Sequence, residues 1–198
     1  MRKAGSKELE NRRTIPFLCD PFPFFLPSSF RFGFSSSKVD DSPFMKIRPF
    51  LPVDADAVRS LVFSSLEEHG LKPSPDSTDK DLDDVEAFYA KGTFDVLENF
   101  EGELIGTVAV LPVREDLAEL RKMYLHRDWR GRGLGHQLLV QGLKRAGELG
   151  MKSVYLETAT PLKSAIALYK RCGFKPYEAD HLSDRCDQAW ILELDADD

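Results

Sequence analysis

The segment RGRGLG, Arg130–Gly135, gathers three glycines and two arginines between an alternating apolar segment and a long amphipathic one. Glycine adopts backbone angles that other residues avoid, and it lets a ligand approach the main chain closely. A helix that starts directly after such a turn directs its free N–H groups back toward the turn. Backbone donors and the positive end of a helix dipole favour a bound anion, so this segment is predicted to hold a phosphate group.

Two common phosphate-binding motifs are excluded by the residues that follow these glycines. A Walker loop needs Lys and then Ser or Thr after its last glycine, whereas Gly135 is followed by His136 and Gln137. The dinucleotide fingerprint needs a glycine three residues after its second one, and that position is His136. A strand, a glycine-rich turn and a helix start remain, which together favour a pyrophosphate.

The elements that must position this turn follow from the hydrophobic period of the chain. A helical period predicts helices over about 54–69, over 82–89, from the glycine turn to Leu149, and over 165–172. In the second helix Phe88 is expected to face inward, with Thr78 as a cap. Alternating, β-branched and aromatic residues predict strands at 45–50, 94–100, 103–111, 118–126, 153–160, 174–178 and 187–194.

The order of these elements predicts the fold class. The strands on either side of the turn EGE form a hairpin, whereas residues 118–160 form a strand–helix–strand crossover. A hairpin and a crossover in one chain indicate an α/β (α+β) fold with a central sheet of mixed direction.

Composition divides the chain at Met45. Residues 1–44 are rich in phenylalanine, proline and serine without a lasting period, so we interpret them as an irregular N-terminal extension and residues 45–198 as one domain. From Met45 onward the chain holds 20 basic and 28 acidic residues, and a net charge of -8 disfavours a nucleic-acid partner. The sequence contains no run of about 18 apolar residues, so it predicts no membrane-spanning helix.

Three cysteines, Cys19, Cys172 and Cys186, are too far apart for a disulfide framework or a paired zinc site. We therefore expect a cytoplasmic protein without a metal.

The glycine turn resembles the acetyl-CoA motif of the GNAT N-acetyltransferase superfamily. That motif runs Arg or Gln, two residues, Gly, one residue, then Gly or Ala, and Arg130, Gly133 and Gly135 match it. MYLHRDWRGRGLGHQLL is similar to the family's fourth strand and third helix, and LETATPLKSAIALYKRCGF to its fifth strand, fourth helix and the start of the next strand. The resemblance covers about 45–194 and implies a mixed, largely antiparallel sheet with a splayed pair of parallel strands and helices on both faces.

The resemblance also implies acetyl-CoA as co-substrate and assigns residues to bind it. The end of the fourth strand pairs its main chain with the pantetheine arm, and the glycine turn supplies amides to the pyrophosphate. The cofactor-binding residues expected in this way are Met123, Tyr124, Leu125, Arg130, Gly131, Arg132, Gly133, Leu134, Gly135 and His136. Some relatives have an asparagine as a further cofactor contact where this chain has Leu162, and Lys163 is the residue that can reach a phosphate instead.

For catalysis, the resemblance assigns Tyr169 as the acid that protonates the departing CoA thiolate. A primary amine with a pKa near 10.4 is protonated at neutral pH and must lose a proton before it attacks. Glu157 matches a carboxylate that serves some relatives as the general base, and Glu119 is the other candidate. Without the motif, Tyr169 would be interpreted as packing and Glu157 as a solvated strand residue.

These observations leave alternatives open. The function predicted is transfer of an acetyl group to a primary amine of a small molecule or peptide by direct attack in a ternary complex. The alternative is a catalytically silent CoA-binding sensor or interaction module, and a nucleotide hydrolase lacks a metal-holding carboxylate cluster beside the turn. A loop containing His181, Asp184, Arg185 and Asp187 is either part of the acceptor pocket or a solvated surface. The sequence leaves open the acceptor and whether the protein is a homodimer.

Overall fold

The computed structural model describes residues 45–194 of the 198-residue chain. The predicted extension over 1–44 therefore lies outside the described residues. The strands are β1 (Lys46–Pro49), β2 (Thr93–Glu98), β3 (Leu104–Pro112), β4 (Leu117–Leu125), β5 (Ser153–Thr158), β6 (Lys175–Tyr177) and β7 (Gln188–Glu193). The helices are α1 (Ala55–Glu67), α2 (Val85–Phe88), α3 (Leu134–Glu148) and α4 (Lys163–Arg171), with 3-10 turns at Pro52–Asp54, Lys80–Leu82 and Arg127–Trp129.

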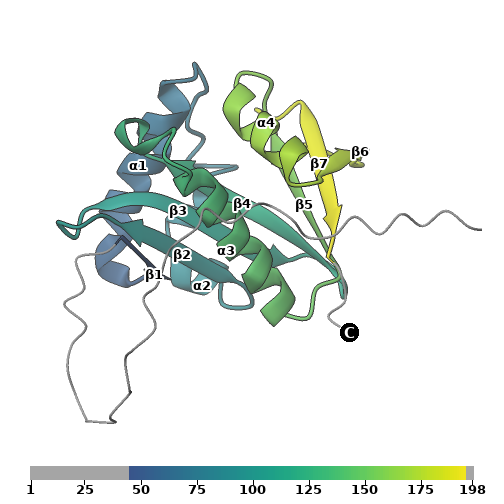
Figure 1. Cartoon of the computed structure of the whole chain (residues 1–198), viewed down its shortest axis with the longest axis horizontal. Coiled ribbons are helices and arrows are strands. Elements are labelled where there is room, and N and C mark those ends of the chain that lie inside the picture. The colour runs from purple at the N-terminus through teal and green to yellow at the C-terminus, as the bar shows by residue number, and fades with distance from the viewer. Residues whose placement is uncertain (1–44, 195–198) are drawn as a thin grey trace, which may run out of the picture. The chain divides into compact units, whose positions relative to one another are not determined.

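The strands form one seven-stranded sheet in the order β1-β2-β3-β4-β5-β7-β6 (Figure 1). All neighbouring strands are antiparallel except β4 and β5, which are parallel. The predicted mixed, largely antiparallel sheet is confirmed. The helix that connects the parallel pair is α3, which crosses one face of the sheet.

The parallel pair separates soon after it begins. β4 and β5 pair only from Leu117 with Ser153 to Glu119 with Tyr155, although each strand continues for several residues beyond this point. The expected splay is present. The later part of β4 therefore has no pairing with β5 along that edge.

A bulge near the end of β4 places the consecutive side chains of Arg121 and Lys122 on one face, where both lie near the Asp81 carboxylate. Arg121 pairs with Ala109 and Tyr124 with Thr107, so β4 has one residue more than β3 in this interval. The extra residue is Lys122, whose φ of 46° lies in the left-handed region. The hydroxyl of Thr107 donates to the Lys122 carbonyl oxygen at 2.7 Å and satisfies it within the bulge.

Two hydrophobic clusters cover the two faces of the sheet. α1 packs on one face together with the segment that holds Leu82, Val85 and Tyr89, and α3 and α4 pack on the other face. α3 approaches the sheet closely at Gly142, where an added Cβ would lie 2.5 Å from the Leu120 side chain. None of the helices over 45–194 is long and apolar enough to cross a membrane.

The second predicted helix differs in detail from the structure. The 3-10 turn at Lys80–Leu82 precedes the short α2 (Val85–Phe88). Asp84, not Thr78, caps α2 by accepting a hydrogen bond from the Ala87 amide at 3.0 Å. Phe88 is 45% exposed rather than buried, because Val85 and Tyr89 fill the positions that face the sheet. The predicted inward position of Phe88 and the predicted cap were wrong.

Candidate active site

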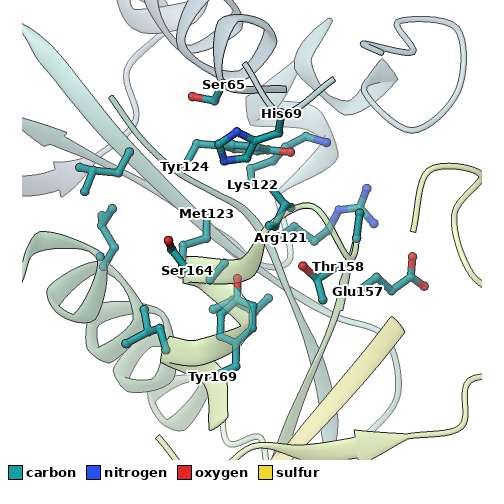
Figure 2. Close-up of a pocket in the computed structure, with 18 of the residues that line it drawn as sticks. Ser65, His69, Arg121, Lys122, Met123, Tyr124, Glu157, Thr158, Ser164 and Tyr169 are labelled. Carbon is teal, nitrogen blue, oxygen red and sulfur yellow. The ribbon is translucent and has the colours of Figure 1, made fainter. Parts of the chain in front are cut away.

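A pocket of about 650 Å³ opens where β4 and β5 separate (Figure 2). The end of α1, the end of β4, the glycine turn, the end of β5, α4 and the loop before β7 all contribute to its lining. It contains Glu157, Tyr169 and every predicted cofactor-binding residue except Arg132 and Leu134. Segments that are far apart in the sequence are thus brought to one cavity.

The glycine turn presents main-chain donors to this pocket. Gly131 and Gly133 have φ of +77° and +82°, in the left-handed region that favours glycine, and Gly133 directly precedes α3. The amides of Leu134 and Gly135 are at the first positions of α3, where a helix offers no internal acceptor. The amide of His136 already donates to the Gly133 carbonyl oxygen at 3.0 Å.

The predicted cofactor residues that do not line the pocket have their side chains elsewhere. The Leu134 side chain is buried in the α3 cluster. The Arg132 guanidinium lies over the Trp129 ring, 4.9 Å from its centroid. Any contact of Leu134 with a pyrophosphate would therefore come from the main chain.

Arg130 joins the turn to two other parts of the site. Its Nε donates to the Leu125 carbonyl oxygen at 3.0 Å, and its guanidinium pairs with Glu68 at the end of α1 at 2.9 Å. The bond to Leu125 shows that this carbonyl points away from β3. The amide of His126 donates to Ile105 on β3, so by strand alternation the Leu125 amide faces the open edge of β4.

The side chains at the end of β4 alternate between the two faces. Met123 and Leu125 pack against the α3 cluster, and Tyr124 packs against the α1 cluster. Burial raises the pKa of the Tyr124 phenol, and with the lowering effect of Arg185 and the raising effects of Asp79 and Cys186 the pKa is about 12. Tyr124 is therefore a neutral wall of the pocket at physiological pH.

Tyr169 projects from α4 into the pocket. Its ring packs against Phe174, with centroids 5.7 Å apart, and only 6% of the residue is exposed. Figure 2 shows the hydroxyl directed toward the part of β4 that holds Met123. Within residues 45–194 this hydroxyl has no hydrogen-bond partner. Burial raises the pKa of the phenol, so Tyr169 keeps its proton at physiological pH.

Glu157 lies on β5 and extends away from Tyr169 (Figure 2). Its Oε2 accepts hydrogen bonds from both the amide and the hydroxyl of Ser183. The other candidate base, Glu119 on β4, is 8% exposed, and its Oε2 accepts from Arg121 at 2.9 Å. Glu119 is thus held by a cation, whereas the Oε1 atom of Glu157 has no hydrogen-bond partner among the described residues.

A buried ionic network, which the sequence did not predict, lies beside the pocket. Asp79 is fully buried; it pairs with Lys122 at 3.0 Å and accepts two hydrogen bonds of 2.6 Å from Arg185. Asp81 lies 3.1 Å from the same lysine ammonium and accepts from the Tyr89 hydroxyl at 2.5 Å. Of the four charged residues considered in the loop before β7, Arg185 lines the pocket, and His181, Asp184 and Asp187 do not.

The structure brings no metal-binding group to this site. Over residues 45–194, no three His, Cys, Asp or Glu side chains gather where a metal ion would bind. His126 accepts a hydrogen bond from the Asp128 amide at the turn after β4.

Comparisons with known proteins agree with this geometry. The sequence model of the acetyltransferase (GNAT) family matches residues 57–174. The chain is 34% identical over 128 residues to the uncharacterized N-acetyltransferase YjgM of Escherichia coli K12, a match that covers 62% of this chain and 77% of that protein. An acetyltransferase of the GNAT family from Staphylococcus aureus Mu50 has a similar structure, with a TM-score of 0.72 at 20% identity over 76% of this chain and 99% of that chain.

A further solved structure contains the cofactor. The phosphinothricin acetyltransferase of Sinorhizobium meliloti in complex with acetyl-CoA has a TM-score of 0.61 at 19% identity, over 76% of this chain and 88% of that chain. The fold, the matched family and the relatives together place this chain in the GNAT family. It is an N-acetyltransferase of that family.

Proposed function

We propose that this enzyme transfers the acetyl group of acetyl-CoA to a primary amine by direct attack, with both substrates bound at once. The observation that carries this proposal is that one pocket contains three features: the glycine turn, the unpaired edge of β4 and the hydroxyl of Tyr169. The glycine turn suits the phosphates of CoA, the unpaired edge of β4 suits its extended amide-containing arm, and the Tyr169 hydroxyl can protonate the leaving thiolate.

The pocket residues fit acetyl-CoA in chemical terms. The turn has no side chain at Gly131, Gly133 or Gly135, and an added Cβ at the first two would meet nothing within 4 Å. Open space and helix-start amides suit a pyrophosphate. The Leu125 amide faces the open edge of β4, where it is placed to donate to the thioester carbonyl oxygen and stabilise the charge that develops there.

Proton transfer determines the roles of the acidic and phenolic groups. The acceptor ammonium must first lose a proton, and we assign this step to Glu157 through a water molecule, since its carboxylate extends away from Tyr169. The amine nitrogen then forms the new bond to the carbonyl carbon, and the bond from that carbon to sulfur breaks. The nitrogen, which still carries two protons after the attack, releases one of them to water to give the neutral amide. Tyr169 gives its proton to the departing thiolate and is later reprotonated from solvent.

The test is an acetyl-CoA consumption assay over a panel of small amines and peptides, with calorimetric binding of acetyl-CoA in parallel. Binding and thiol release with at least one amine support the proposal. Binding without release on any amine would instead support the silent CoA-binding module. No binding of acetyl-CoA by a folded sample would contradict both functions.

The base is tested by Glu157→Gln and Glu119→Gln in the same assay. We expect Glu157→Gln to lower kcat by about 10²-fold or more, because the amide does not accept a proton. Glu119→Gln is expected to act mainly through stability, because it removes the nearer of the two carboxylates that pair with the Arg121 guanidinium, the other being Asp81. The reverse order of effects on kcat would assign the base to Glu119.

A further inference from the structure

The hydroxyl of Thr158 is a buried polar group without a partner in the protein. Thr158 is the last residue of β5, is 3% exposed and lines the pocket. Its Oγ1 atom is fully buried and makes no hydrogen bond within residues 45–194. Figure 2 shows this hydroxyl directed toward the space in which the Tyr169 hydroxyl also ends.

The surroundings of Thr158 do not explain why a hydroxyl is present. The pocket residues that follow it are apolar up to Tyr169, namely Ala159, Leu162, Ala165, Ala167 and Leu168, apart from the exposed Ser164. A buried hydroxyl without a partner destabilises the folded state. Valine has nearly the same shape without the hydroxyl, so packing alone would favour valine at this position.

The place of Thr158 indicates what its partner is. Strand alternation puts its side chain on the side of Leu156, which packs in the cluster with α3 and α4, and opposite to Glu157. Across the splay from this end of β5 lies the unpaired edge of β4. An uncharged hydroxyl in an apolar wall suits an amide or a thioester better than a phosphate, because a buried phosphate needs charged or multiple donors.

We propose that the Thr158 hydroxyl forms a hydrogen bond with the acyl-pantetheine arm of acetyl-CoA, an inference that rests on the proposed function. A hydroxyl both donates and accepts, so it can bond an amide N–H or a carbonyl oxygen of the arm. The arm is then held on both sides, by the main chain of β4 and by the side chain of Thr158. Thr158 is therefore a cofactor-positioning residue, distinct from the glycine turn.

The experiment measures calorimetric binding of three ligands to the full chain and to Thr158→Val. The ligands are acetyl-CoA, CoA and 3′-phospho-ADP, which is the nucleotide part of CoA without the arm. We expect Thr158→Val to weaken acetyl-CoA and CoA by about 3- to 10-fold, as one hydrogen bond predicts, and to leave 3′-phospho-ADP unchanged. Thr158→Ser keeps the hydroxyl and is expected to bind like the wild type.

A control is the same change two residues further on. Thr160 is exposed and does not line the pocket, so Thr160→Val should bind all three ligands like the wild type. Without ligand, Thr158→Val should melt at the wild-type temperature or above it, because it removes an unpaired buried hydroxyl.

Two results would overturn the inference alone: unchanged acetyl-CoA affinity in Thr158→Val, or equal weakening of all three ligands, which would mean a general distortion of the site. No acetyl-CoA binding by the wild type would overturn the proposed function and this inference together.

Discussion

Asp79 and Arg185 are 106 residues apart in the sequence and are joined by two hydrogen bonds of 2.6 Å. Asp79 follows α1 in a loop, and Arg185 lies in the loop before β7. Lys122, in the bulge of β4, pairs with the same carboxylate at 3.0 Å. The buried carboxylate of Asp79 thus links its own loop to the loop before β7 and to the end of β4, beside the pocket.

Replacing Asp79 with asparagine is expected to destabilise the protein strongly. The change leaves the guanidinium of Arg185 without its carboxylate partner in a buried place and leaves Lys122 paired with Asp81 alone. Loss of one partner of a buried ion pair typically costs about 3 to 5 kcal/mol. Chemical denaturation measures the free energy of unfolding. Asp83→Asn is the matched control, because its pair with Arg59 is at the surface and should cost less than about 1 kcal/mol. Equal effects of the two changes would contradict the role of Asp79.

The same carboxylate should contribute to acid unfolding. Burial alone would raise its pKa, but the hydrogen bonds from Arg185 and the charge of Lys122 outweigh burial and lower the pKa to about 2. An unfolded aspartate has a pKa of about 3.9, so the folded state binds the proton less readily. The stabilisation is complete above about pH 5 and is lost as the pH falls from about 4 to 2, by about 2 kcal/mol. Unfolding curves at several pH values should therefore show a smaller loss of stability in Asp79→Asn than in the wild type over this interval.

The glycine turn is tested by Gly133→Val against Gly150→Val. Both glycines have left-handed φ, +82° and +76°, and an added Cβ at either would meet nothing within 4 Å, so both changes should strain the backbone similarly. Only Gly133 lines the pocket, whereas Gly150 follows the other end of α3. We expect similar melting temperatures for the two variants and loss of acetyl-CoA binding in Gly133→Val alone. Calorimetric affinities that match in the two variants would show that the turn serves only the fold.

Tyr169→Phe should reduce turnover without a matching loss of cofactor affinity. The ring and its packing on Phe174 remain, while the proton donor for the thiolate is lost, so kcat is expected to fall by about 10²- to 10⁴-fold. Tyr177→Phe is the control, since the Tyr177 hydroxyl accepts only an exposed bond from Arg114. Steady-state kinetics with acetyl-CoA and the acceptor found in the panel give kcat, and calorimetry gives the affinity. Full turnover in Tyr169→Phe would contradict the role of Tyr169 as proton donor and would show that the residue serves only in packing.

The sequence predicted those parts of the fold that depend on local patterns. Hydrophobic period located the strands and the long helices, and the three closely spaced glycines that end at the start of α3 located the turn. The short α2 was harder: both Phe88 and Tyr89 were expected to face inward, and four residues carry too little period to show that only Tyr89 does. The roles of Tyr169 and Glu157 came from the resemblance and stay predictions.

The sequence did not predict contacts between side chains that are far apart in the chain. Asp79 and Arg185 each lie in polar loops, and nothing in their local patterns distinguishes them from solvated neighbours such as Asp83 or Asp184. Their burial depends on how two loops meet over the sheet. Thr158 was missed for a related reason: threonine is common in strands, and only the absence of a partner in the folded chain marks its hydroxyl.

The early separation of β4 and β5 also affects how the protein avoids aggregation. The outer strands of the described sheet, β1 and β6, are four and three residues long and contain Pro49 and Pro176, so they offer little to an incoming strand. The longer unpaired edge, at the end of β4, faces a pocket bounded by α1, α4 and the glycine turn. Because these elements surround it, this edge is less accessible to a neighbouring protein's sheet than an outer edge of the same length would be. An unpaired edge that would promote self-association on the outer surface therefore lies inside a pocket.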